Sequence, residues 1–335
     1  MGVTVKDIAK KANVSTATVS NVLTQKKHVS DLLAQRVYDA VNALGYRPNH
    51  YARGLKTNRS YTIGIQIPDI TNPYFGNAVK VIQTEAAASG YQVVLYNTGN
   101  VIATERQNIE GMLNAHVDGM ICVAPRLGLE SMLDTVHVPI IIVDRLPIQT
   151  NRNVAFVYSD NYSGAAAVAK YMIGKGYKHF LCLSGPINLV TNAKERLNGF
   201  TQTLMRNGIP KDDCRTCCGE FTFECGYSML NDMLDTGLPM GSDTAAFVAS
   251  DIMAWGAMEA LKDRKMKIPQ DMGIVGYDNI DFSNFLYPTL TTVENPIREM
   301  SHKAVHLLLD AMENDRNLEG MSIMANASLV ERNSC

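Results

Sequence analysis

The chain has 335 residues, of which 46% are hydrophobic and 19% are charged, and its net charge is −2. This length exceeds one ordinary domain and predicts two or three, with enough apolar residues for buried cores. No aliphatic run approaches the ~20 residues that a membrane-spanning helix needs, and the charged start lacks the apolar stretch of an export signal. Seven cysteines, an odd number, favour reduced thiols over a disulfide framework. We therefore expect a soluble cytoplasmic protein.

The small net charge conceals an uneven distribution along the chain. Residues 1–60 contain ten Lys and Arg and three acidic residues, which gives them a net charge of +7, whereas the rest of the chain carries −9. A basic head joined to an acidic body predicts a polyanionic partner for the head alone.

Two short helices are predicted at the start of residues 1–47. Thr4 and Asp7 form a capping box ahead of an apolar helical face, and Ser15 can cap a second helix over residues 16–23. Helices joined by so tight a turn form a helix-turn-helix, whose second helix fits the major groove of DNA. Any small three-helix bundle could share this spacing, but the spacing itself favours DNA binding and the positive charge of the head adds to it.

A third helix is predicted from Ser30 to the glycine stop at Gly45. Residues 48–60 follow as a short basic segment, too isolated to form a stable helix in water. The segment could fold on DNA or serve only as a linker. Its one large aliphatic residue, Leu55, has little core to enter.

The head contains the stretches VTVKDIA at 3–9, VSTATVSNVL at 14–23, GYRPN at 45–49 and ARGL at 52–55. With these stretches it closely resembles the lactose/purine-repressor (LacI-type) family, and the resemblance continues to the C-terminus. It implies that residues 49–56 form a hinge helix, paired with that of a dimer mate in the minor groove. Leu55 would then be an apolar wedge between central base pairs.

The family resemblance also implies which residues contact DNA. They are Thr4, Ser15, Thr16, Ala17, Thr18, Ser20, Asn21, His28, Asn49, Ala52, Arg53, Leu55 and Lys56. Thr16, Ala17 and Asn21 occupy the positions that read bases in the major groove. Thr16 and Ala17 are too small for bidentate contacts, so Asn21 is the leading candidate for sequence discrimination.

From Tyr61 the pattern changes to short aliphatic strands that alternate with helices. Strands are predicted at 62–67, 92–96, 120–123, 139–143, 154–158, 180–183, 244–248 and 273–275, with a final strand that ends at 331–332. Helices are predicted near 74–89, 104–115, 129–135, 161–175, 193–207, 223–235, 252–265 and 298–315. This alternation predicts an α/β body of two doubly wound subdomains, each with a parallel sheet covered on both faces.

We expect three segments: an all-α helix-turn-helix DNA-binding domain at 1–47, a hinge helix and linker at 48–60, and an effector-binding and dimerisation domain at 61–335. Within the last, the first subdomain is expected to comprise 61–158 with 290–320, and the second 159–289 with 321–335.

Ligands of open α/β sheets bind beyond the carboxyl ends of the strands, where the loops of this body carry polar and aromatic residues. The body resembles periplasmic sugar-binding proteins of the ribose type, and their ligand-binding positions fall on Asn72, Tyr74, Phe75, Asp144, Arg145, Arg196 and Asp278. Phe221 is either a wall of the cleft or a core residue. Ser250 replaces an expected amide side chain, and Glu294 stands where glutamine is typical. The resemblance implies a pentose, a hexose or a derivative as effector, rather than a purine.

Other candidate sites lack some of the residues that a metal site or an active site requires. Cys214, Cys217 and Cys218 cluster in a predicted polar loop but lack a fourth ligand. His302 and His306 lie one helical turn apart, with no third ligand evident nearby in the sequence. The chain has no nucleophile elbow, paired base or dinucleotide fingerprint. We predict no catalytic residue, no metal and no cofactor other than a small-molecule effector.

The sequence thus predicts a homodimeric transcription factor, a repressor, that binds pseudo-palindromic operator DNA and responds to a sugar, with no membrane partner. Two other readings stay open within this architecture. One is a sugar-binding protein or sensor that does not bind DNA, and the other is a regulator controlled by a purine or by a protein corepressor. An enzyme on the same doubly wound fold is disfavoured, because no catalytic constellation is evident.

Overall fold

The computed structural model describes residues 3–24, 27–46, 59–133, 135–148, 153–236 and 241–335. The chain divides into two compact units, Met1–Ser60 and Tyr61–Cys335, and each is described by itself.

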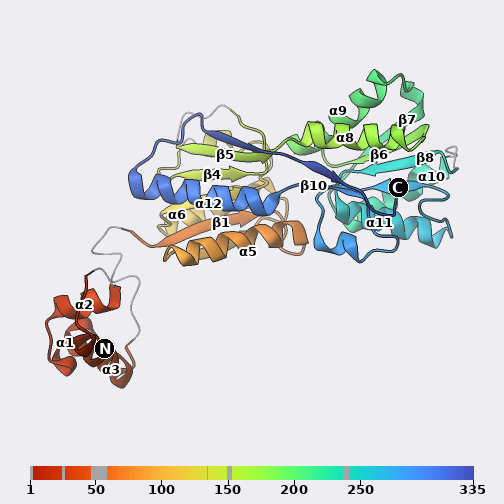
Figure 1. Cartoon of the computed structure of the whole chain (residues 1–335). Coiled ribbons are helices and arrows are strands. Elements are labelled where there is room, and N and C mark those ends of the chain that lie inside the picture. Colours follow the sequence, from red (N-terminus) through yellow and green to blue (C-terminus); the bar gives the residue numbers. More distant parts are fainter. Residues whose placement is uncertain (1–2, 25–26, 47–58, 134, 149–152, 237–240) are drawn as a thin grey trace. The chain divides into compact units, whose positions relative to one another are not determined.

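The described residues of the first unit form three helices, α1 (Val5–Ala12), α2 (Thr16–Thr24) and α3 (Asp31–Leu44) (Figure 1). The Asp7 carboxylate accepts a hydrogen bond from the Thr4 main-chain N at 2.8 Å, as the capping box predicted. Ser15 Oγ accepts from the main-chain N of Thr18 at 3.0 Å and so begins α2. Gly45, with φ 60°, ends α3 in the left-handed conformation.

The three helices enclose one small core, in which Ile8, Val19 and Val37 are fully buried. The Arg36 side chain joins α3 to the turn between α1 and α2, because its Nη2 donates to the main-chain O of Ala12 at 2.6 Å. The predicted helix-turn-helix is therefore present, and its three helices begin and end within one residue of the predicted bounds.

The second unit contains two subdomains built on parallel sheets (Figure 1). The first sheet has the order β11-β5-β4-β3-β1-β2, with strands β1 (Thr62–Ile67), β2 (Gln92–Asn97), β3 (Gly119–Val123), β4 (Ile140–Val143), β5 (Val154–Ser159) and β11 (Ser322–Ala325). Helices α5 (Pro73–Ala88) and α12 (Ile297–Asn314) cover one face, and α6 (Ile102–Asn114) and α7 (Glu130–Leu133) cover the other. The inner strands β3 and β4 are buried throughout, as helices on both faces require.

The second sheet has the order β7-β6-β8-β9, with strands β6 (His179–Ser184), β7 (Cys214–Cys218), β8 (Thr244–Val248) and β9 (Gly273–Val275). Helices α8 (Asn161–Gly174) and α9 (Thr191–Arg206) pack on one face, and α10 (Phe223–Asp235) and α11 (Asp251–Asp263) pack on the other. Beside them lie the short helices η1 (Lys211–Asp213) and η2 (Asp281–Asn284), and the antiparallel pair β10 (Thr292–Glu294) and β12 (Ser328–Val330). Among the described residues, no helix is both long and apolar enough to cross a bilayer.

Two expectations about the C-terminal part were wrong. The single final strand is in fact two strands, because β11 pairs with β5 in the first sheet, whereas β12 pairs with β10 beside the second. Residues 322–325 thus belong to the first subdomain rather than the second. Residues 290–294 do not belong to the first, since Leu290 lies in a core of the second subdomain and β10 lies beside it.

The cysteine cluster was also misplaced, because Cys214–Cys218 is an edge strand and not a loop. Its sequence lacks the aliphatic residues that mark the inner strands, since an edge strand packs few side chains into the core. All seven cysteines are free, and in the described part of the chain no group of three metal-ligating side chains includes one.

Candidate ligand cleft and nucleic-acid interface

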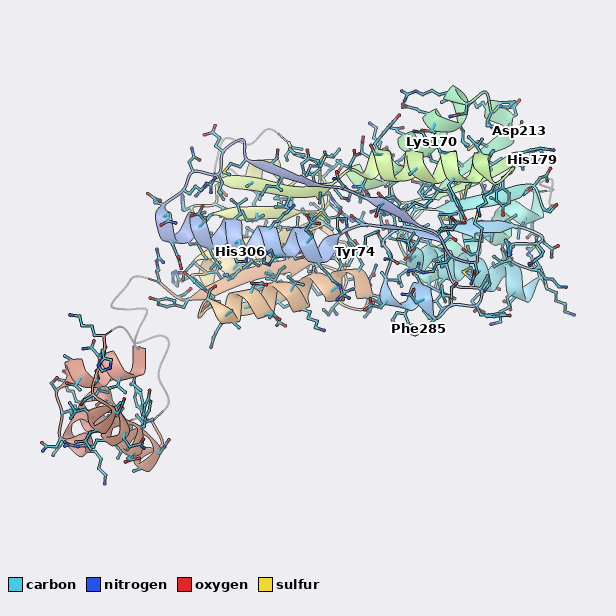
Figure 2. All side chains as sticks on the ribbon, viewed as in Figure 1. Tyr74, Lys170, His179, Asp213, Phe285 and His306 are labelled. Carbon is cyan, nitrogen blue, oxygen red and sulfur yellow. The ribbon has the colours of Figure 1, made fainter. Side chains whose placement is uncertain are left out.

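A cleft between the two subdomains spans about 660 Å³ of space not occupied by protein atoms, part of which is open to solvent. It lies at the carboxyl ends of the strands, and Figure 2 shows Tyr74 at this junction. Nine of the ten predicted effector residues line it: Asn72, Tyr74, Phe75, Asp144, Arg145, Arg196, Phe221, Ser250 and Asp278. The tenth, Glu294, lies outside the lining.

Left-handed backbone turns follow the strands that reach the cleft. Ala124 and Asp144, directly after β3 and β4, have φ values of 50° and 59°, and Asp278, after β9, has a φ of 115°. Non-glycine residues pay a conformational cost in such turns, and turns of this kind concentrate at functional sites.

Arg145 holds two of these turns together. Its Nε donates to Pro125 O and its Nη2 to Ala124 O, both at 2.6 Å, and its Nη1 donates to Asp144 O at 2.7 Å. Burial lowers the pKa of Arg145 to about 10, so the guanidinium stays charged at neutral pH. All three nitrogens of Arg145 thus support the main chain beneath the cleft.

Arg196 is the buried cation of the second subdomain. Its Nε donates to Asn161 Oδ1 at 2.7 Å and its Nη1 to Ala249 O at 2.6 Å. Its Nη2 lies 3.3 Å from Asp278 Oδ1, and its guanidinium carbon lies 3.8 Å from the centre of the Tyr277 ring. Three polar contacts and one stacked ring fix the orientation of this planar group.

Two acidic groups of the cleft, the Asp278 carboxyl and the Tyr74 phenol, are buried and have raised pKa values. Burial raises the pKa of Asp278 to about 8, although the charge of Arg196 opposes this shift. Burial also raises the pKa of Tyr74 well above its usual value, and Asp144 and Asp278 add to the effect. Fixed carboxyl, guanidinium and phenol groups in one cavity suit a neutral ligand with several hydroxyl groups.

Aromatic side chains face the cleft from both subdomains. The rings of Tyr74 and Phe75 meet edge to face at 5.3 Å, and the Phe221 ring lies 6.0 Å from the guanidinium carbon of Arg196. A Cβ at Gly185 would lie 2.1 Å from the Phe221 ring, so the absence of a side chain there lets the ring pack close to the loop. Phe221 lines the cleft and also packs against the core of its subdomain.

Two predicted departures from the family pattern have different positions. Ser250 lines the cleft and caps α11, since its Oγ accepts from the main-chain N of Met253 at 3.3 Å. Glu294 on β10 instead accepts a hydrogen bond from Asn279 Nδ2, and Asn279 Oδ1 accepts from Arg332 at 2.6 Å. The carboxylate of Glu294 therefore binds Asn279 in the loop after β9 and does not line the cleft, which corrects its assignment to the effector site.

Three residues that the sequence analysis did not single out join the two sides of the cleft. Asn192 Nδ2 donates to Asp144 Oδ1 at 2.8 Å, and Arg126 forms an ion pair with Glu220 at 2.7 Å. Asn192 lies one helical turn before Arg196 on α9, and that spacing could have identified it. Arg126 and Glu220 carry no comparable local signal.

The second helix of the head presents small polar residues. Thr16, Ala17 and Ser20 are exposed on α2, Thr18 and Asn21 are partly buried, and Val19 is buried in the core. Thr4, Ser15 and His28 are also exposed. The remaining predicted DNA contacts, Asn49, Ala52, Arg53, Leu55 and Lys56, fall outside the described residues.

A helix-turn-helix unit and a two-lobed body with an interlobe cleft define the class of ligand-controlled DNA-binding proteins, and comparison with known proteins agrees. The model of bacterial regulatory proteins of the lacI family matches residues 4–49, and that of the periplasmic binding protein-like domain matches residues 169–335. The HTH-type transcriptional repressor CytR of Escherichia coli (strain K12) is 34% identical over 333 residues, which cover 99% of this chain and 96% of that protein.

Solved structures show the same relationship. The Lac repressor dimer bound to operator and the anti-inducer ONPF has a TM-score of 0.84 and 27% identity, covering 100% of this chain and 99% of that one. A LacI family transcriptional regulator from Enterococcus faecium with bound ribose has a TM-score of 0.69 and 26% identity, covering 82% of this chain and 98% of that one. The chain belongs to the LacI family. It is a DNA-binding, effector-controlled transcriptional regulator and not an enzyme.

Proposed function

We propose that this regulator is a homodimeric repressor whose effector is a pentose, a hexose or a derivative, bound in the cleft between the two subdomains. The observation that carries the proposal is the fixed pair of Arg196 and Asp278, whose Nη2 and Oδ1 atoms lie 3.3 Å apart in the wall of the cavity. A guanidinium donates and a carboxylate accepts, so together they match a pair of adjacent hydroxyl groups on a sugar ring.

The opposite wall complements this pair. Asp144 can accept from further hydroxyl groups, and Phe75 offers an apolar face to the C–H surface of a sugar. Phe221 offers a second apolar face from the same wall as Arg196. The ribose-bound relative from Enterococcus faecium supports this ligand class. A purine would need amide side chains that are open to its ring edges, whereas Asn72 caps α5 with its Oδ1 and Asn192 donates its Nδ2 to Asp144.

The proposed mechanism is linkage between two sites. A sugar that contacts both walls changes how the subdomains close, and this changes the spacing of the paired hinge segments at 48–60. A coupling free energy of ~1–3 kcal/mol would alter operator affinity roughly 5–150-fold. The same linkage serves an inducer, which weakens DNA binding, or a corepressor, which strengthens it.

A thermal-shift screen against pentoses, hexoses, polyols and nucleobases tests the ligand class. We expect a sugar to raise the unfolding temperature, and a response to nucleobases alone would overturn the assignment. Arg196→Lys retains a positive charge but loses the planar fork. It should weaken sugar binding by about 30-fold, the equivalent of roughly 2 kcal/mol, whereas Asn198→Ala on the same helix should not.

Fluorescence anisotropy with a pseudo-palindromic operator, selected from a random library, tests the head. Specific affinity should fall steeply with salt, because several phosphates are neutralised. Asn21→Ala should cost ~1–3 kcal/mol of discrimination between operator and random DNA. Leu55→Ala should weaken operator binding while sugar binding is kept. Analytical ultracentrifugation should show a dimer, and a monomer on the operator would contradict the paired hinges.

A further inference from the structure

One surface cluster on the first subdomain has no part in the cleft. Glu85 on α5 contacts both His302 and His306 of α12, and Figure 2 shows His306 on that helix. His302 Nδ1 is 3.1 Å from Glu85 Oε1, and His306 Nε2 is 3.5 Å from Glu85 Oε2. The two imidazole rings are 4.3 Å apart, centre to centre. The tertiary structure thus supplies a third ligand, from 217 residues away in sequence, for the histidine pair.

The spacing of these groups suits a small metal ion. The three ligand atoms all lie within 4.8 Å of one another. Metal–nitrogen and metal–oxygen bonds of ~2.0–2.2 Å in a tetrahedral site place neighbouring ligand atoms roughly 3.3 Å apart. The two N···O distances, 3.1 and 3.5 Å, are close to that value but involve different oxygens of Glu85, so side-chain rotations would bring the three ligands around one ion. Two histidines and one carboxylate are also a ligand set that zinc takes in proteins.

The packing beneath the cluster fixes the two helices that carry it. Ala86, next to Glu85, is fully buried in the core of the first subdomain, and so is Val305, next to His306. Ser301, next to His302, is fully buried as well. The histidine side chains themselves are 54% and 55% exposed, which leaves room for a water molecule as the fourth ligand.

We propose that Glu85, His302 and His306 form a binding site for one divalent transition-metal ion, Zn²⁺, which bridges α5 and α12. Imidazole nitrogens favour zinc, copper or nickel over Mg²⁺, which prefers oxygen ligands. Both helices begin at the cleft, since Asn72 caps α5 and Asn295, just before α12, donates to Tyr74 Oη. The ion would therefore link two helices that support the effector site. The proposed metal site itself does not depend on which effector binds.

The test uses tag-free, full-length protein freed of metal with a chelator. Competition with a chromophoric zinc indicator should show one Zn²⁺ per chain that the double variant His302→Gln/His306→Gln lacks. Glu85→Gln should weaken binding at least about tenfold. Mg²⁺ should not compete. Circular dichroism of the variants checks that they fold, which exposed side chains should permit.

A matched control comes from the second subdomain. His179 Nδ1 lies 3.0 Å from Asp213 Oδ1, a histidine–carboxylate pair that belongs to no group of three metal-ligating side chains among the described residues. Both residues are labelled in Figure 2. His179→Gln should retain the full stoichiometry and affinity of the wild type. The cysteines are present in every variant, so zinc bound to thiols cancels in the comparison.

Two further readouts decide the proposal. Substituted Co²⁺ should show visible absorption bands of a tetrahedral site in the wild type but not in the double histidine variant. Zn²⁺ should raise the unfolding temperature of the wild type and leave that of the double variant unchanged. Equal stoichiometry and affinity in the wild type and the double variant would overturn the site.

Discussion

Asn192 on α9 and Asp144 after β4 join the two subdomains across the cleft. Asn192 Nδ2 donates to both the main-chain O of Asp144 at 3.0 Å and its Oδ1 at 2.8 Å. Both side chains are buried, and Asn192 Oδ1 has no protein partner among the described residues. The amide nitrogen of Asn192 thus links the two sides of the cleft. Its oxygen is a buried acceptor that a ligand hydroxyl would satisfy.

Asn192→Ala should therefore weaken effector binding. It removes a charge-assisted hydrogen bond across the cleft and an acceptor for the ligand, so we expect a loss of ~1.5–3 kcal/mol in the binding free energy. Isothermal titration with the sugar found in the screen measures it. Asn198→Ala, on the same helix but outside the cleft lining, is the control. Unchanged affinity in Asn192→Ala would contradict the assignment.

Gly185→Ala should displace the Phe221 ring, because the new Cβ would come within 2.1 Å of it. We expect effector affinity to fall about tenfold, since the ring forms part of the cleft wall. A double-mutant cycle with Phe221→Ala separates this from a general backbone effect. In the Phe221→Ala background, Gly185→Ala should reduce effector affinity little further. Strictly additive losses would show that Gly185 acts without the ring.

Effector affinity should rise with pH if sugar hydroxyls donate to ionised Asp278. The pKa of about 8 leaves most of this carboxyl protonated at pH 7 in the free cleft. Binding to the ionised form alone predicts roughly tenfold higher affinity at pH 9 than at pH 7. Asp278→Asn should bind weakly with no such dependence. Titrations across this range measure it, and a flat profile in the wild type would refute the role.

The same carboxyl should make unfolding pH dependent. Its folded pKa lies above the unfolded value of ~3.9, so the folded state binds the proton more tightly. The free energy of unfolding should therefore fall as pH rises from about 4 to about 8, and less so in Asp278→Asn.

Arg36→Ala should destabilise the head without affecting the cleft. The guanidinium donates to the carbonyls of Ala12 and Asn13 at the turn before α2, at 2.6 and 3.2 Å. Because the site is only partly buried, we expect a loss of ~1 kcal/mol in the opening free energy of α1–α3 amides, measured by hydrogen exchange. Gln35→Ala, which removes an exposed contact to Asp39 on the same helix, should change it less. Faster exchange confined to α3 would argue against a role at the turn.

Sequence periodicity determined the order and type of most elements. Strands β1, β8 and β9 and helix α10 have the predicted bounds, because buried parallel strands are aliphatic runs and amphipathic helices repeat with the helical turn. The cleft was also predictable, since parallel strands bring their carboxyl ends to one edge and nine of the ten expected residues line it. The edge strand β7 was missed, because a strand with little buried surface has little apolar signal.

The sequence alone thus determined the helix-turn-helix, the doubly wound body and the residue types at the strand ends, because each depends on short-range patterns. Only the tertiary structure decided that β11 and β12 join different sheets, that Arg145 holds the main chain and that Glu294 bonds Asn279 outside the cleft lining. It also decided that Glu85 meets His302 and His306. These outcomes depend on strand pairing and helix packing between distant segments, and local periodicity carries no information on which distant segments meet.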